Sequence, residues 1–114
     1  MPLQVEHVDD VAIVTATKRL IVEEEIRDLD TALTQLIVED GQLKTVLDMS
    51  ETRLVSSMAL GVLVKTQLSI RERQAHFAIC NVHPRLHSVI ARCFGSVIQE
   101  FKTCDEALAA MRKL

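Results

Sequence analysis

Several short runs in this chain alternate apolar, often β-branched residues with polar ones, which is the pattern of a half-buried β-strand. The clearest is VAIVTAT, residues 11–17, which follows the turn signal VDD. We expect it to pair as a hairpin with an earlier strand around Leu3 to His7. Three further strands are expected at residues 43–49, 75–80 and 97–101.

Between these runs the apolar residues recur every three or four positions, which indicates helices with one buried face. The first predicted helix runs from Val22 to Gly41; three glutamates near its start complement the positive end of the helix dipole, and the glycine ends it. Its expected buried face consists of Val22, Ile26, Leu29, Leu33, Leu36 and Ile37. A second helix is expected over about residues 57–72, with Leu60, Leu63, Val64 and Leu68 at helical spacing.

Two more helices are predicted in the last third of the chain. One begins at Pro84, because proline suits the first turn of a helix, and ends at Gly95. Its buried stripe would be Leu86, Val89, Ile90 and Cys93. The other follows a capping box formed by Thr103 and Glu106 and would bury Ala107, Met111 and Leu114.

An opening hairpin followed by alternating strands and helices predicts an α/β fold: a mixed, partly parallel sheet of four to five strands with helices packed on it. The chain has 114 residues, of which 48% are hydrophobic and 25% charged, with three glycines and two prolines. This is the composition of a globular protein, and without repeats or linkers residues 1–114 are expected to form a single domain.

Charge and cysteine content narrow the functional classes. The net charge is −3, and the 13 basic residues are scattered along the chain, which argues against nucleic acid as a partner. No apolar run reaches 18 residues and MPLQVEHVDD has no signal-peptide pattern, so we expect a cytoplasmic protein without membrane insertion. Cys80, Cys93 and Cys104 contain no C-x-x-C pair and are expected to be free thiols in a reducing compartment.

Two hydroxyls, Ser56 and Ser57, lie between the third predicted strand and the second predicted helix. One interpretation is structural, because serine caps helices by accepting a backbone N–H that the helix leaves unpaired. The other is functional, because a hydroxyl at a helix N-terminus is a place where an added phosphate is stabilised. Both can hold at once, and the neighbouring apolar residues Met58 and Val62 are where a partner protein would bind.

Other constellations are weaker. Cys80, His83 and His87 have the spacing C-x2-H-x3-H, but only three ligands are visible and we expect no metal site. Nothing marks a cysteine as an activated nucleophile, so no catalytic residue and no cofactor is assigned. The sequence therefore favours a binding protein over an enzyme.

The segments TVLDMSETRLVSSMALGVLVKTQ and AHFAICNVHPRLHSVIARCFGSVIQEFKTCDEALAAM resemble the STAS domain of bacterial anti-sigma-factor antagonists. That family has an apolar strand ending in Asp, the motif D-S-S-G-L-G at the start of a helix, a V-x-P helix start and a final EAL helix. Aligned on LGV, Ser57 occupies the position of the serine that a partner kinase phosphorylates. Ser56 replaces the family's Asp, Met58 its second serine and Ala59 its first glycine.

The resemblance implies a protein that binds an anti-sigma serine kinase and so frees a sigma factor, with Ser57 as the phosphorylation site and a serine phosphatase as a further partner. Ser56, Ser57, Met58 and Val62 are then the expected partner-binding residues. The alternative is a STAS adaptor that is not phosphorylated and belongs to a larger assembly, either a signalling complex or one associated with a transporter.

Overall fold

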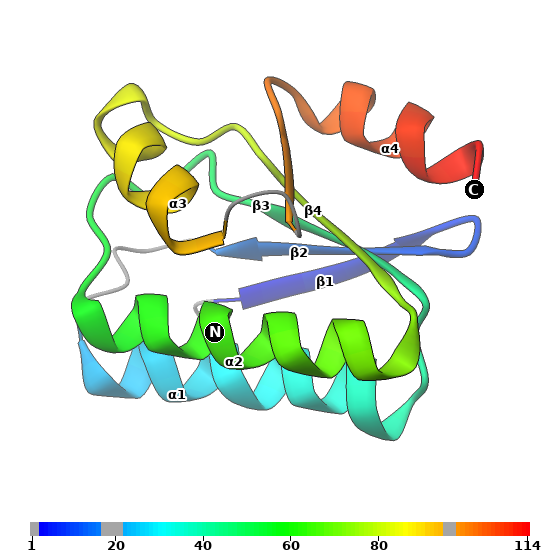
Figure 1. Ribbon diagram of the computed structural model, residues 1–114, viewed down its shortest axis with the longest axis horizontal. Helices are drawn as coiled ribbons and strands as arrows, with labels where there is room; N and C mark the ends of the chain where they lie inside the picture. The colour runs from blue at the N-terminus through cyan, green and yellow to red at the C-terminus, as the bar shows by residue number, and fades with distance from the viewer. Residues whose placement is uncertain (1–2, 17–21, 95–97) are drawn as a thin grey trace.

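The computed structural model describes residues 3–16, 22–94 and 98–114, in which helices cover both faces of a five-stranded sheet (Figure 1). The strands are β1 (Leu3–Val8), β2 (Val11–Ala16), β3 (Lys44–Asp48), β4 (His76–Cys80) and β5 (Gln99–Phe101). The helices are α1 (Glu23–Thr34) with its π-helical continuation η1 (Gln35–Glu39), α2 (Ser57–Arg73), the 3-10 turn η2 (Pro84–Leu86), α3 (His87–Phe94) and α4 (Cys104–Arg112). The predicted α/β class and the order of the elements are confirmed.

The strands lie in the order β1-β2-β3-β4-β5, with β1 and β2 antiparallel and the other pairs parallel. Helices connect the parallel strands, as such crossovers require. The alternation along β2 divides its side chains between two cores. Ala12 and Val14 belong to one buried cluster, whereas Val11 and Ile13 belong to the other. Burial on both faces explains why β2 is almost entirely apolar.

The larger core lies between the sheet and three of the helices. Leu29 and Leu33 of α1 and Leu63 of α2 are essentially inaccessible to solvent, and Ile90 of α3 joins the same cluster. On the opposite face, α4 packs Ala107 and Met111, together with two partly buried neighbours, over β2, β3 and β4. Figure 1 shows α1 and α2 side by side on one side of the sheet and α4 on the other.

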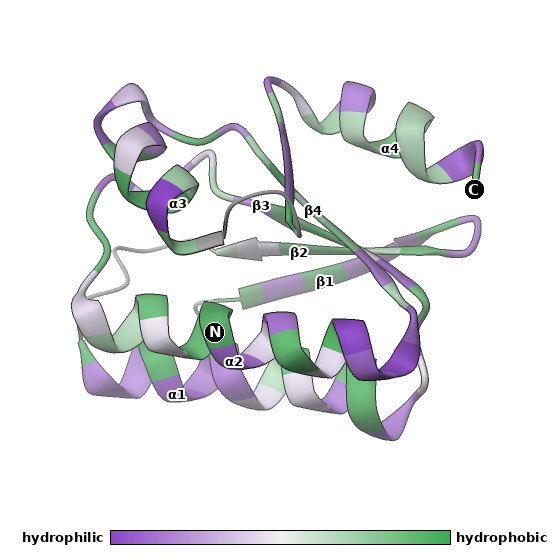
Figure 2. Ribbon diagram, in the orientation of Figure 1, coloured by the Kyte–Doolittle hydropathy of each residue, from purple (hydrophilic) through white to green (hydrophobic). Residues whose placement is uncertain are grey.

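Hydrophobic residues recur along the strands and along the helices that cover them (Figure 2). Five positions that the spacing placed on buried faces are nevertheless exposed: Val22, Val64, Leu68, Val89 and Leu114. Val22 precedes α1 as its N-cap residue. In α2 the buried residues are Ala59, Leu63, Thr66 and Ile70. Val64 is about 100° around the helix from Leu63, so it turns away from the sheet.

Several predicted helix ends have the expected geometry. Gly41 has a positive φ of 67°, the left-handed conformation that glycine adopts most easily, just after η1. The Thr103 side chain accepts a hydrogen bond from the backbone N–H of Glu106 at 3.1 Å, as an N-cap residue does. Gly95 as a helix end, and Thr17 and Val97 as strand residues, lie outside the described part of the chain.

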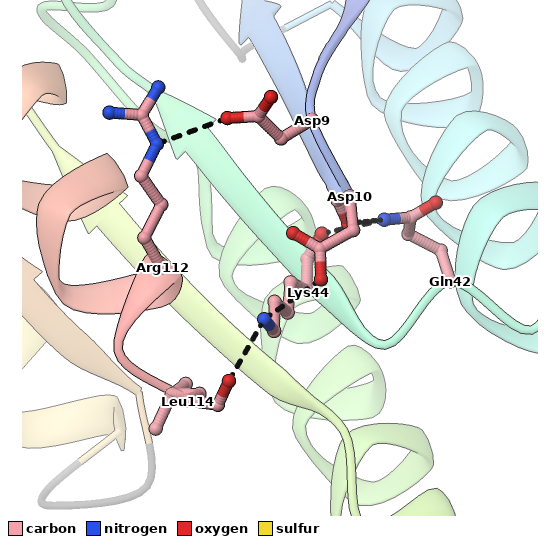
Figure 3. Close-up of polar contacts among 6 residues, drawn as sticks. All are labelled: Asp9, Asp10, Gln42, Lys44, Arg112 and Leu114. Carbon is pink, nitrogen blue, oxygen red and sulfur yellow. Dashed lines mark hydrogen bonds and ion pairs between the residues drawn. The ribbon is translucent and has the colours of Figure 1, made fainter.

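Polar contacts connect the β1–β2 turn to the end of α4 and the start of β3 (Figure 3). Lys44 Nζ lies 2.8 Å from Asp10 Oδ2 and donates to the Leu114 carbonyl at 3.2 Å. Arg112 Nε lies 3.2 Å from Asp9 Oδ2. The hydrogen bond from Lys44 is the main cause that lowers the pKa of Asp10. These contacts lie at the amino end of β3, so the loop at its carboxyl end remains available for a functional site.

Candidate functional site at the start of α2

The loop between β3 and α2 is attached to the sheet at its first residues. Asp48 Oδ1 accepts hydrogen bonds from the backbone N–H of Ser50 at 2.9 Å and from Asn81 Nδ2 at 3.0 Å. The backbone N–H of Met49 donates to the Cys80 carbonyl at 3.0 Å, and the Met49 side chain is fully buried. These contacts give the loop a defined path from the carboxyl edge of the sheet to the first turn of α2.

Ser56 is the N-cap residue of α2. Its backbone is extended, with φ −80° and ψ 164°, and its Oγ accepts a hydrogen bond from the backbone N–H of Ala59 at 3.2 Å. Its carbonyl accepts from the Leu60 N–H at 3.1 Å, the first hydrogen bond of the helical ladder. The structural interpretation of this serine is therefore confirmed.

Ser57 is the first residue of α2, and its side chain is exposed. The first turn of α2 contains no acidic residue. The backbone N–H groups and the positive end of the helix dipole therefore meet no carboxylate from within that turn, which favours a negatively charged group there. The prediction that Ser57 lies at a helix N-terminus is confirmed, and its role as a phosphorylation site stays a prediction.

The two apolar residues expected to bind a partner lie beside this turn. Met58 is 59% exposed, and Val62, one turn later, is half-buried. They line a shallow pocket together with residues of α1, namely Glu23, Ile26, Arg27 and Asp30. Helix α1 thus supplies a charged rim that sequence analysis did not assign, because no pattern in a single sequence shows which helices are neighbours.

Charged pairs hold this rim in place. Arg27 lies 2.7 Å from Glu23 within α1, and Lys65 of α2 lies 3.0 Å from Asp30 of α1. The second pair connects the two helices on either side of the pocket. Such exposed pairs contribute about 0–1 kcal/mol each to stability, so their main effect here is to place charge around an apolar floor.

A row of exposed residues extends from Ser57 along the outer surface of α2. The row, called here the α2 stripe, consists of Ser57, Gly61, Val64 and Leu68. Residues three and four positions apart share a helix face. Val64 and Leu68 are 41% and 54% exposed, and a Cβ built on Gly61 would meet nothing within 4 Å. An exposed apolar surface therefore extends from Ser57 along α2, and it has no side chain at the position of Gly61.

The histidines of the C-x2-H-x3-H spacing make other contacts. His83 Nδ1 accepts a hydrogen bond from the Arg85 backbone N–H at 3.1 Å, and His87 Nδ1 contacts a carboxylate oxygen of Glu100 in β5. Neither histidine belongs to the group of possible metal ligands that includes Cys80 among the described residues.

Cys80 is grouped instead with Asp48 and Cys104, and the three ligand atoms lie within 4.8 Å of one another. Burial raises the pKa of the Cys80 thiol, with further contributions from Cys104 and Asp48. Burial also raises the pKa of Cys104, although a hydrogen bond with Cys80 partly opposes it. Sequence spacing missed this group, but Cys80 ends a predicted strand and Asp48 is the second-last residue of another, and the carboxyl ends of parallel strands meet at one edge of a sheet.

Among the described residues, none of the helices combines the length and the apolar character needed to cross a membrane.

Comparison with known proteins gives one family. The sequence model for the STAS domain matches residues 2–107, and no curated protein sequence matches the chain. The structure of the Thermotoga maritima protein TM1081 aligns with a TM-score of 0.87 and 23% identity, over 96% of this chain and 94% of that chain. The phosphorylated form of SpoIIAA from Bacillus aligns with a TM-score of 0.76 and 13% identity, over 95% and 97%.

The murine anion transporter Slc26a9 also aligns, with a TM-score of 0.72 and 16% identity. The match covers 96% of this chain but 19% of the transporter. At these identities the structural matches establish a shared fold.

Proposed function

The chain belongs to the STAS domain family, and we propose that it is an anti-sigma-factor antagonist that binds an anti-sigma serine kinase and thereby releases a sigma factor. The observation that carries the proposal is the position of Ser57, an exposed hydroxyl at the start of α2 and at one end of an exposed apolar surface. A modification at this residue would change the charge of that surface without disturbing the core.

In this proposal the unmodified protein binds the kinase through the first turns of α2. Met58 and Val62 contribute apolar contact beside the charged rim of α1, and the α2 stripe extends the contact along the helix. Ser56 contributes indirectly, because its cap hydrogen bond holds the first turn, and with it Ser57, in a fixed position.

Phosphorylation of Ser57 would then dissociate the complex. A phosphate adds about −1.5 to −2 charges. A hundredfold loss of affinity requires about 2.7 kcal/mol, which is within the range of desolvation and like-charge repulsion at an interface. In the free protein the same phosphate would face the N–H groups of the first turn of α2, so the modified chain would remain folded. A serine phosphatase would restore the binding state.

The protein would thus act by binding, in the cytoplasm, and would not be an enzyme. In the described residues the three cysteines are free thiols, and burial raises the pKa of both Cys80 and Cys104, which is the opposite of thiol activation.

A second candidate is a STAS adaptor that is never phosphorylated. It is favoured by the residues around Ser57, because Ser56, Met58 and Ala59 each depart from the family motif D-S-S-G. Without a carboxylate next to the acceptor hydroxyl, a kinase loses a group that could orient it. The chain also aligns with 19% of an anion transporter, and a match to one part of a larger protein agrees with an adaptor role.

The two candidates differ in the mass of the protein isolated from its own host. We would purify wild type, Ser57→Ala and Ser56→Ala from that host, measure intact masses and map any phosphate. The antagonist role predicts a phosphorylated fraction in wild type and Ser56→Ala that is absent from Ser57→Ala. Wild type that carries no phosphate under any growth condition would favour the adaptor. Phosphate mapped to Ser56 would contradict the assignment of Ser57 as the phosphorylation site.

Binding can be tested by calorimetry with a candidate anti-sigma serine kinase from the host organism. Ser57→Asp should bind more weakly than wild type, because a carboxylate places charge where the interface expects a neutral hydroxyl. Ser57→Ala should bind as wild type does but should not be released on addition of ATP. Release of Ser57→Ala by ATP to the same extent as wild type would exclude Ser57 as the switch.

A further inference from the structure

We propose that Asp48, Cys80 and Cys104 form a binding site for one soft divalent cation, of which Zn²⁺ is the biological example. The site is separate from the phosphorylation proposed above and does not depend on it. Its residues come from the carboxyl ends of β3 and β4 and from the first residue of α4, and their ligand atoms lie within 4.8 Å of one another.

The geometry is close to that of a tetrahedral site. Zinc lies about 2.3 Å from thiolate sulfur and about 2.1 Å from carboxylate oxygen, so two sulfurs and one oxygen bound to it are about 3.6 to 3.8 Å apart. The observed upper limit of 4.8 Å requires each pair to approach by about 1.2 Å at most. Asp48 and Cys104 are both partly exposed, so an adjustment of these two side chains is the change that binding would require.

The surroundings of Asp48 resemble the outer shell of a metal site. Two donors, the Ser50 N–H and Asn81 Nδ2, hold Asp48 Oδ1 at 2.9 and 3.0 Å. The same Asn81 amide nitrogen lies 3.9 Å from Cys80 Sγ. In metal sites, such second-shell hydrogen bonds orient the ligands. Here one amide contacts two of the three candidate ligands.

The donor set also suits zinc, which proteins bind through thiolate sulfur and carboxylate oxygen. Binding would release the proton of each of the two thiols. Three protein ligands leave one position of a tetrahedral site for water.

A disulfide between the two cysteines explains fewer of these observations. It would use only the two sulfurs and would not involve the Asp48 carboxylate, which lies within 4.8 Å of both. The arrangement of all three groups therefore favours a cation over a redox pair.

Co²⁺ is the probe for the test, because thiolate ligands give bound cobalt an intense charge-transfer band. The reduced full-length protein would be stripped of metal with a chelator and titrated with Co²⁺, followed by displacement with Zn²⁺. We expect one equivalent to bind wild type and Cys93→Ser, since Cys93 is a cysteine outside the group. Cys104→Ser should lose the thiolate band and at least about tenfold in Zn²⁺ affinity, which corresponds to about 1.4 kcal/mol.

Asp48→Asn and a double His83→Ala, His87→Ala variant complete the set. Asp48→Asn should also lose about tenfold or more in affinity, whereas the double histidine variant should bind as wild type does. Circular dichroism of each variant reports whether it is folded, and Cys104, which is only partly buried, makes its serine variant the safer test. The proposal is overturned if reduced wild type binds no cobalt, if Cys104→Ser binds as tightly as wild type, or if removing the histidines abolishes binding.

Discussion

Replacing Ser56 with alanine isolates the capping role of this residue from any role in signalling. The variant removes the oxygen that accepts the Ala59 N–H at 3.2 Å and leaves the backbone of α2 unchanged. Loss of a serine N-cap costs about 1 kcal/mol, within a range of about 0.5–2. Because Ser56 is half-buried, water can replace part of the lost hydrogen bond, so we expect a value near 1 rather than 2 kcal/mol.

The assay is urea denaturation followed by circular dichroism, with a thermal scan as a second measurement. A loss of about 1 kcal/mol should lower the melting temperature of a domain of this size by about 4 °C. Ser57→Ala is the matched control, because its hydroxyl is exposed and does not cap the helix, so its stability should stay within about 0.5 kcal/mol of wild type.

Ser56→Asp provides the opposite test, because aspartate caps helices as well as serine does and adds a favourable charge at the positive end of the helix. Its stability should equal or exceed that of wild type by about 0.3–1 kcal/mol at low ionic strength. Equal losses in Ser56→Ala and Ser57→Ala, or a destabilised Ser56→Asp, would refute the assignment of Ser56 as the cap.

Further variants test the packing and the polar contacts. Leu63→Ala removes a fully buried side chain between α2 and the sheet and should cost about 2–5 kcal/mol in urea denaturation; a cost below 1 would contradict the packing of α2. Gly61→Ala should stabilise α2 by about 0.5–1 kcal/mol, because the added Cβ meets open space. Gly41→Ala should lose about 1 kcal/mol of stability, because Gly41 has a positive φ. Changes of the opposite sign would contradict the backbone conformation of these two glycines. Because the folded-state pKa of Asp10 is lowered by Lys44, their contact stabilises the fold above about pH 4, the unfolded pKa, and this contribution disappears as the pH falls through the lower folded value. The difference in urea midpoint between wild type and Lys44→Met should therefore shrink below pH 4, and a constant difference would exclude this origin.

Local pattern was sufficient to predict most of the elements. The alternation along residues 11–17 and the changed period from Val22 onward predicted strand and helix, and the structure confirms the element order. These properties depend on neighbours in sequence, because side-chain direction follows the local backbone period. The N-cap role of Ser56 and the helix end at Gly41 are local for the same reason.

The sequence was a poorer guide to which face of each helix is buried. Val64 and Leu68 fit a helical period as well as Leu63 does, yet only Leu63 is buried. Which side of α2 faces the sheet depends on α1, α3 and the strands that it contacts, and these are distant in sequence. The spacing alone could therefore not show that two apolar residues would lie outside the core, in line with Ser57.

One part of the candidate site follows from the local sequence, and the other part depends on the tertiary structure. The sequence by itself placed Ser56, Ser57 and Met58 at the start of a helix, because they are consecutive residues between a strand and a helical pattern. Only the tertiary structure brought α1 to the side of Val62 and placed Cys104 next to Asp48 and Cys80. Contacts between segments more than 20 residues apart arise when the strands pair and the helices pack, and no local periodicity encodes which segments will meet.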